Sequence, residues 1–197
     1  MYNGTKISFV REYVYLGNIL DPNLTLSSNF NRFYKQASSR LRLLNNIRRY
    51  LNVDAATKIF NMMILPLLTY SGPVKSSFTK TQQDRMSSLT RRARVITQNT
   101  NIKDVFQEIN LQNCMLVKKC LQGQTGSYVF NKYFEIQNNG RHTRNENYSI
   151  KLKPIKLEVS RQSFYYNGAK LFNSLPREIR LKRDQADFQP SLLKHKF

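Results

Sequence analysis

The sequence predicts a mainly α-helical protein with a short β element at its amino terminus and a small β segment near its carboxyl terminus. Apolar residues recur at helical spacing in three successive segments. The opening residues instead alternate as strands do. A polar, Asn- and Gly-rich stretch at 137–149 then separates the helices from a short alternating run. The 197 residues suffice for one domain, or for one domain with a small appendage.

Residues 1–26 are predicted to form one or two short strands. Ile7, Phe9, Tyr13 and Tyr15 supply the alternating positions. Asp21-Pro22-Asn23 is typical of a turn and ends this region.

The next segment is predicted to be an amphipathic helix of about 23 residues, capped by Ser27 or Ser28. Its apolar positions follow a spacing of three, four and seven: Phe30, Phe33, Ala37, Leu41, Leu44 and Leu51. At about 100° per residue, four basic residues gather on the opposite side: Arg32, Lys35, Arg42 and Arg49. The helix therefore presents one apolar stripe and one basic stripe.

A second helix is expected to begin at Asp54 and to lie centrally, because it is apolar on most sides from Ala56 to Leu68. Pro66 removes a backbone donor and should kink this helix. Ser71-Gly72-Pro73 is expected to end it.

A third helix is expected to begin near Thr81, with Asp84 as a weak capping-box partner. It should bury Met86, Leu89, Ala93 and Ile96, while Arg85, Arg91, Arg92 and Arg94 flank or oppose that stripe.

The remaining residues predict shorter elements. Three helical pieces are expected over Ile102–Ile109, Asn113–Gln122 and Tyr128–Ile136, an edge strand over Ile150–Val159, and a short helix over Phe164–Leu175. A basic tail follows, with Phe188 and Leu192-Leu193 as anchors. The predicted divisions are 1–26 as a β connection, 27–136 as a helical bundle, and 137–197 as loop, short strand and terminal helix with tail.

The charge balance predicts a polyanionic partner. The chain carries 32 Lys and Arg against 12 Asp and Glu, a formal net charge of +20. No acid occurs from Pro22 to Val53 or from Arg85 to Lys103. Ordinary solvated helices mix the two signs, so acid-free helices favour a surface for phosphates over an idle basic face.

Seven residues on these helices are the predicted nucleic-acid contacts: Arg32, Lys35, Arg42, Arg49, Arg91, Arg92 and Arg94. Arginine predominates, and its planar fork suits bidentate contact with phosphate. The pattern does not distinguish DNA from RNA. Tyr34 and Tyr50 flank the first basic face and are candidates for base stacking.

No catalytic signature is present. The twelve acids are scattered with no adjacent pair, and neither a Gly-rich phosphate loop nor an HExxH or nucleophile motif occurs. We therefore expect no enzymatic activity, cofactor, metal or small-molecule substrate. Cys114 and Cys120 match no zinc spacing and are expected to be core thiols.

The start of the chain lacks the apolar run of a signal peptide, and the most apolar segment, Met62–Leu68, is too short to span a bilayer. The expectation is a soluble, intracellular protein, nuclear or cytoplasmic, that does not bind membranes.

Four motifs in order resemble the region after the palm in non-LTR (LINE, jockey-like) retrotransposon reverse transcriptases. Tyr15-Leu16-Gly17 with Leu20-Asp21 and Leu24-Thr25 resembles the family's YLG…LD..LT segment, and residues 64–72, ILPLLTYSG, its l..P.l.YG helix end. Residues 92–97, RARVIT, resemble RA.R.IT. Residues 161–180, with Phe172-Asn173 and Leu175-Pro176, resemble R.sF…WN.LP..ir. The family's tryptophans are missing, Phe172 standing where one is usual.

This resemblance implies a helical thumb and the region beyond it. In such polymerases the thumb lies against the template–primer duplex, either RNA–DNA or DNA. The chain would then be a non-catalytic, nucleic-acid-binding fragment of an RNA-directed DNA polymerase, since the palm with its paired aspartates is missing from these residues. Two alternatives remain: a subunit that works with a separate polymerase palm, and a host-adopted or structural module that binds protein and not nucleic acid.

Overall fold

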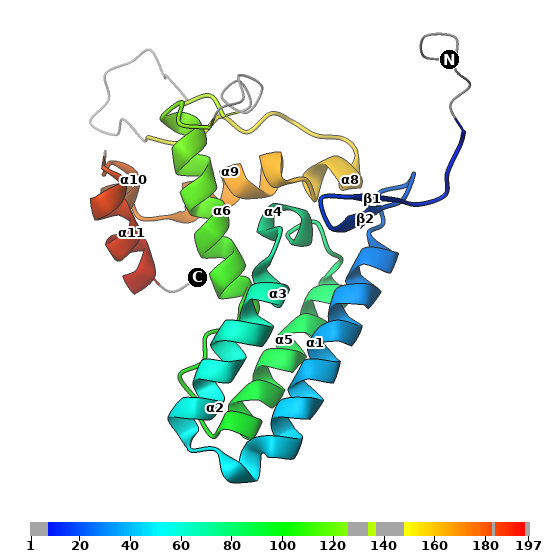
Figure 1. Ribbon diagram of the computed structural model, residues 1–197. Helices are drawn as coiled ribbons and strands as arrows, with labels where there is room; N and C mark the ends of the chain where they lie inside the picture. The colour runs from blue at the N-terminus through cyan, green and yellow to red at the C-terminus, as the bar shows by residue number, and fades with distance from the viewer. Residues whose placement is uncertain (1–7, 126–133, 137–147, 183, 196–197) are drawn as a thin grey trace.

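The computed structural model describes residues 8–125, 134–136, 148–182 and 184–195 (Figure 1). Helices make up most of this part, and an antiparallel pair of short strands precedes them. The predictions of a mainly α fold and of an amino-terminal β element are therefore confirmed.

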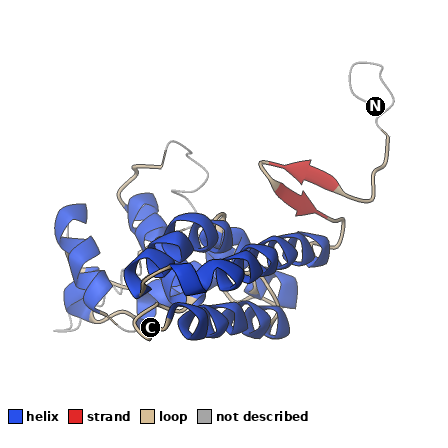
Figure 2. Ribbon diagram, turned by 60° about the horizontal axis from the view of Figure 1, so that its bottom comes forward, coloured by secondary structure: helices blue, strands red, loops and turns tan. Residues whose placement is uncertain are grey.

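The β element is a hairpin of β1 (Tyr13–Tyr15) and β2 (Asn18–Leu20). Leu16 and Gly17 form its turn with φ values of 45° and 75°. Two successive left-handed residues match the right-handed twist of the strands, and glycine adopts this conformation without steric cost. The hairpin projects from the helical body (Figure 2).

Helix α1 (Ser27–Ile47) buries Phe30, Phe33, Ala37, Leu41 and Leu44, as the spacing predicts. The sixth predicted position, Leu51, lies beyond the helix and is only half-buried. The predicted serine cap is wrong, because no side chain caps this helix. Instead, the Asp21 carboxylate accepts hydrogen bonds from the backbone N–H groups of Asn23, Thr25 and Leu26 just before the helix. Desolvation of the Asp21 carboxylate acts to raise its pKa, but these bonds together outweigh that effect, and the pKa is lowered from its ordinary value.

The predicted second helix is divided by a wider turn. It consists of α2 (Val53–Ile59), a π-helical segment η2 (Phe60–Ile64) and α3 (Leu65–Thr69). Pro66 cannot donate a hydrogen bond to the carbonyl four residues earlier, which interrupts the regular α-helical bonding. The π-helical turn before it accommodates this missing bond. The cap is Asn52, whose side chain accepts from Ala55 N, and not Asp54 as predicted.

Helices α4 (Gly72–Lys75) and α5 (Lys80–Thr97) follow. The third predicted helix thus begins one residue before Thr81. Thr79 and Gln82 form its capping box, because their side chains bond reciprocally to each other's backbone N–H. Asp84 instead forms an exposed ion pair with Lys80 at 3.3 Å.

Two predicted helical pieces are a single helix, α6 (Val105–Leu121), which Asp104 caps with Gln107. Of the third piece, residues 128–133 lie outside the described part. Ile136 at its end forms a β-bridge with Ile150.

The predicted strand over Ile150–Val159 is wrong. Beyond the bridge at Ile150, residues 151–157 form neither strand nor helix with any part of the chain that the structure describes, and α8 (Glu158–Arg161) already includes the end of the predicted strand. The predicted aromatic helix is confirmed as α9 (Phe164–Ser174). The presumed tail consists of two helices, α10 (Arg177–Arg180) and α11 (Gln185–Lys194), and α11 buries Phe188 and Leu192.

Two hydrophobic clusters form the core. The first joins α1, α2, η2, α3 and α5, and it ends on α6 at Val105 and Ile109. The second begins on α6 at Leu111 and includes α9 and α11. Helix α6 therefore belongs to both clusters and connects the long bundle to the carboxyl-terminal helices (Figure 1). Gly168 permits the close approach of α9, since a Cβ there would lie 3.0 Å from Val117.

Lys75 is a cation in the interior of this fold, with no exposed surface. Its Nζ donates to the Leu67 carbonyl at 2.7 Å and lies 4.0 Å from the centre of the Phe33 ring. No acid of the described residues forms an ion pair with it. Burial, reinforced by the charge of Arg32, lowers the pKa of Lys75 from 10.5 to about 7.

The free energy of unfolding should therefore rise with pH above neutrality. The unfolded chain keeps the Lys75 proton up to pH 10.5, whereas the folded chain loses it near pH 7. Each pH unit in that window contributes up to about 1.4 kcal/mol. Urea denaturation between pH 7 and 9 should show this rise, and Lys75→Met should remove most of it. Lys119→Met, at an exposed lysine of α6, is the control; an equal slope in wild type and Lys75→Met would contradict the assignment.

Candidate nucleic-acid interface

The two acid-free segments of the sequence include α1 and the part of α5 from Arg85 onward, and these two helices lie side by side (Figure 1). Their apolar stripes pack in the first core cluster, so the remaining faces of both helices meet solvent. Five of the seven predicted contact residues are exposed there: Lys35, Arg42, Arg49, Arg91 and Arg92.

A groove lies between the carboxyl-terminal halves of the two helices. These halves are at the bottom of Figure 1. The groove encloses about 420 Å³ and is lined by Arg42 and Asn45 of α1 and by Arg91, Arg92, Val95 and Ile96 of α5. Below, it is called the α1–α5 groove. Three guanidinium groups from two helices thus border one open hollow.

No acid compensates these arginines within the described part of the chain. The ion pairs there are Lys80–Asp84 and Arg161–Glu158, both outside the groove. Like charges that share a groove repel one another and raise its positive potential. A polyanion would relieve this repulsion, and arginine can contact its phosphates bidentately.

Arg49 and Lys35 extend the basic surface along α1. Lys35 lies one heptad before Arg42, on the same side of the helix. Arg49 belongs to the short helix η1 (Arg48–Tyr50), and its guanidinium lies 4.6 Å from the centre of the Tyr50 ring. Tyr50 is 73% exposed, so this aromatic ring can also meet a base.

Arg32 and Arg94 do not belong to the groove. Arg32 is half-buried, donates to the Gly17 carbonyl of the hairpin turn and lies over the Phe33 ring. Arg94 is half-buried on another side of α5, where its Nε donates to the Ile102 carbonyl at 2.8 Å. Both guanidinium groups therefore hold backbone segments together, and the structure separates them from the other five predicted residues.

Arg85 is a cation of this surface that is missing from the predicted contacts. It is exposed on α5, and its guanidinium lies 4.6 Å from the ring centre of Tyr34 on α1. The sequence pattern that could have identified Arg85 is its spacing of seven residues from Arg92, which places both arginines on one side of α5. Tyr34, a predicted stacking candidate, instead supports this arginine.

Within the described residues, no cluster of three or more His, Cys, Asp or Glu side chains could hold a metal ion, and no helix is long and apolar enough to cross a membrane. Burial raises the pKa of the Cys114 thiol to about 12, which suits the core position predicted for it.

Comparison with known proteins does not assign the chain. It matches no protein-family model, and no curated protein or solved structure matches it.

Proposed function

We propose that this chain binds the phosphate backbone of duplex nucleic acid through the α1–α5 groove and performs no catalysis. The observation that carries the proposal is the groove itself, where Arg42, Arg91 and Arg92 converge from two helices without an acid partner in the described residues. Contacts of this kind position a protein on a duplex and carry little sequence information. Binding should therefore be largely independent of sequence.

We propose further that the chain is the thumb and post-thumb part of a non-LTR retrotransposon reverse transcriptase. The hairpin and the end of α3 carry two of the motifs that resemble this family, and they contact each other. Tyr70 donates through its hydroxyl to the Leu16 carbonyl at 2.7 Å, and the Asn18 amide donates to the Ser71 hydroxyl at 3.0 Å. This contact supports the proposal, because motifs of one functional unit should pack together. The palm would then be on a different part of the polymerase or on a separate chain.

The salt dependence of binding tests the proposed function. Contact with roughly 6–10 phosphates would lower duplex affinity by about 10³–10⁵-fold between 50 and 200 mM salt, because binding releases counterions. Fluorescence anisotropy with duplexes of unrelated sequence measures both the slope and the sequence independence. A flat salt dependence would contradict phosphate binding.

An exposed apolar patch favours a second candidate function, the binding of a protein partner. Leu43 and Ile47 of α1 and Met62 and Met63 of η2 are all exposed, and the Arg40 guanidinium of α1 donates to the Met63 carbonyl at 2.6 Å. Exposed apolar groups that lie together are typical of interaction sites. A dimer in light scattering that resists both salt and nuclease would support this alternative.

A further inference from the structure

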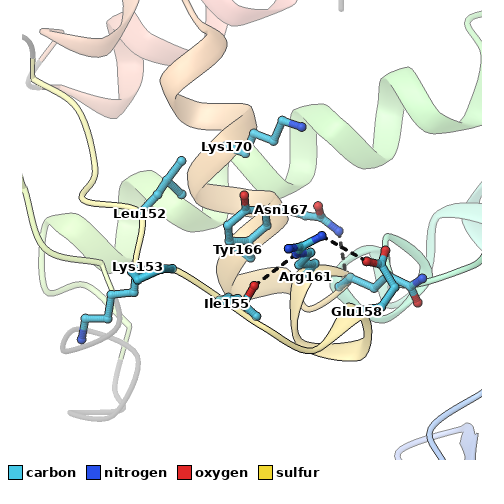
Figure 3. Close-up of a pocket in the computed structure, with 10 residues that line it drawn as sticks. Leu152, Lys153, Ile155, Glu158, Arg161, Tyr166, Asn167 and Lys170 are labelled. Carbon is cyan, nitrogen blue, oxygen red and sulfur yellow. Dashed lines mark hydrogen bonds and ion pairs between the residues drawn. The ribbon is translucent and has the colours of Figure 1, made fainter.

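A second basic surface surrounds a hollow in the carboxyl-terminal part of the chain (Figure 3). The hollow encloses about 640 Å³, against about 420 Å³ for the α1–α5 groove, and lies between α8, α9 and the segment 152–155. Lys153, Arg161 and Lys170 border it, and Glu158 is the acid among its described lining residues. It is called the basic hollow below.

The wall formed by residues 152–155 is held near both ends, although it belongs to no helix or strand. At one end, the Asn173 side chain of α9 donates to the Ile150 carbonyl at 2.9 Å and accepts from the Ile150 N–H at 2.8 Å. At the other end, Arg161 Nε donates to the Ile155 carbonyl at 3.2 Å (Figure 3). The wall is therefore in place before a ligand binds, which lowers the entropic cost of binding.

The three cations of the basic hollow differ in their partners. The Arg161 guanidinium pairs with the Glu158 carboxylate at 3.6 Å, so these two charges offset each other. Lys153 and Lys170 are exposed and form no ion pair with any acid that the structure describes. Positive charge that no neighbouring acid offsets favours a polyanion at this surface.

The positions of the two lysines favour a strand over a small anion. Lys153 lies on the wall 152–155 and Lys170 on α9, and their side chains point apart (Figure 3). They therefore suit two separate phosphates of one polymer. A single strand is flexible enough to follow a concave surface, whereas a DNA duplex is stiff over about 150 bp. Proteins that bind single strands without reading the sequence use a basic groove along the backbone.

The basic hollow and the α1–α5 groove face different sides of the fold. Lys170 also lines a smaller hollow that includes Gln83 of α5. Gln83 and Arg92 of the groove are nine residues apart on this helix, a rotation of about 900° that places them on opposite sides of it. In Figure 1, α8 and α9 are in the upper half, whereas the groove is at the bottom. A duplex in the groove therefore leaves the basic hollow open.

We propose that the basic hollow binds the phosphate backbone of a single-stranded nucleic-acid segment, so that the chain holds a duplex and a single strand at the same time. This inference rests on the proposed function, which assigns the duplex to the α1–α5 groove. It goes beyond that function because it gives the chain a second site and the ability to bridge two nucleic-acid segments.

Competition between the two kinds of nucleic acid tests this arrangement. Fluorescence anisotropy follows a labelled oligothymidylate strand while an excess of unlabelled blunt duplex occupies the groove. Wild type should still bind the strand under these conditions. The double variant Lys153→Glu/Lys170→Glu should bind it about tenfold more weakly at 0.1 M salt. Its slope of log affinity against log salt should fall by about 1.4, since each single-strand phosphate contact contributes about 0.7. Its affinity for the duplex should equal that of wild type.

The matched control is Lys119→Glu/Arg177→Glu, because both residues are exposed, lie outside the basic hollow and change the net charge by the same amount. This control should retain the strand affinity, and thermal unfolding followed by circular dichroism should show that both double variants are folded. Displacement of the strand by the duplex would overturn the inference, as would equal losses of strand affinity in the two double variants.

An anionic membrane is the competing ligand for such a surface, and phosphatidylserine vesicles test it. Loss of vesicle binding in Lys153→Glu/Lys170→Glu with an unchanged strand affinity would assign the surface to a membrane and overturn the inference. Failure of the proposed function is distinguishable, because it would appear as a blunt-duplex affinity that does not depend on salt.

Discussion

Replacement of Arg42, Arg91 and Arg92 by glutamate in one triple variant is expected to lower duplex affinity by about 10²–10³-fold at 0.1 M salt. The three guanidinium groups border the α1–α5 groove and have no described acid partner. Each phosphate contact that is lost should reduce the slope of log affinity against log salt by about one. The slope of the triple variant should therefore fall by about three.

A matched control separates the groove from the overall charge of +20. Lys119, Lys151 and Arg177 are exposed on other parts of the surface, and their replacement by glutamate changes the net charge by the same amount. This control should retain most of the affinity and nearly the full salt slope. Equal losses in the two triple variants would show that the net charge, and not the groove, determines binding.

Leu41→Ala is expected to lower the free energy of unfolding by about 2–5 kcal/mol. Leu41 has no exposed surface and belongs to the first core cluster, so its truncation removes buried apolar area and leaves a cavity. A loss of this size is a large share of the stability of an ordinary domain. Chemical denaturation in urea measures it.

Leu43→Ala is the control on the same helix. Leu43 is 60% exposed and lies outside the described core clusters, so its truncation should cost well under 1 kcal/mol. Similar losses for Leu41→Ala and Leu43→Ala would contradict the orientation of α1, and with it the outward position of Arg42.

Much of the helical architecture could be predicted because helix formation and burial both depend on local periodicity. The spacing of three, four and seven identified the five buried apolar residues of α1, Phe30 to Leu44. The caps were less predictable, because several suitable polar residues lie within a few positions of each helix start. For example, Asn52 and not Asp54 caps α2. Its extended backbone places its side-chain oxygen where it accepts a hydrogen bond from Ala55 N.

The prediction of a strand over Ile150–Val159 was wrong because it, too, rested on local sequence alone. A strand requires a partner backbone, and alternation in one segment does not supply it. Only Ile150 has such a partner in the described residues, at Ile136.

The burial of cations was equally unpredictable from the sequence. Lys118 is enclosed because Arg180, far along the chain, offers its carbonyl at 3.2 Å, and burial lowers the pKa of both side chains.

The sequence by itself determined that two helices would each carry an apolar stripe and an acid-free basic surface, because both properties follow from residue type and helical period. Only the tertiary structure decided which cations remain free. The tertiary structure brings the Gly17 carbonyl to the Arg32 guanidinium and the Ile102 carbonyl to the Arg94 guanidinium, and both arginines donate to these carbonyls. Arg42, Arg91 and Arg92 meet no such carbonyl among the described residues; the packing of α1 against α5 leaves them along one open groove.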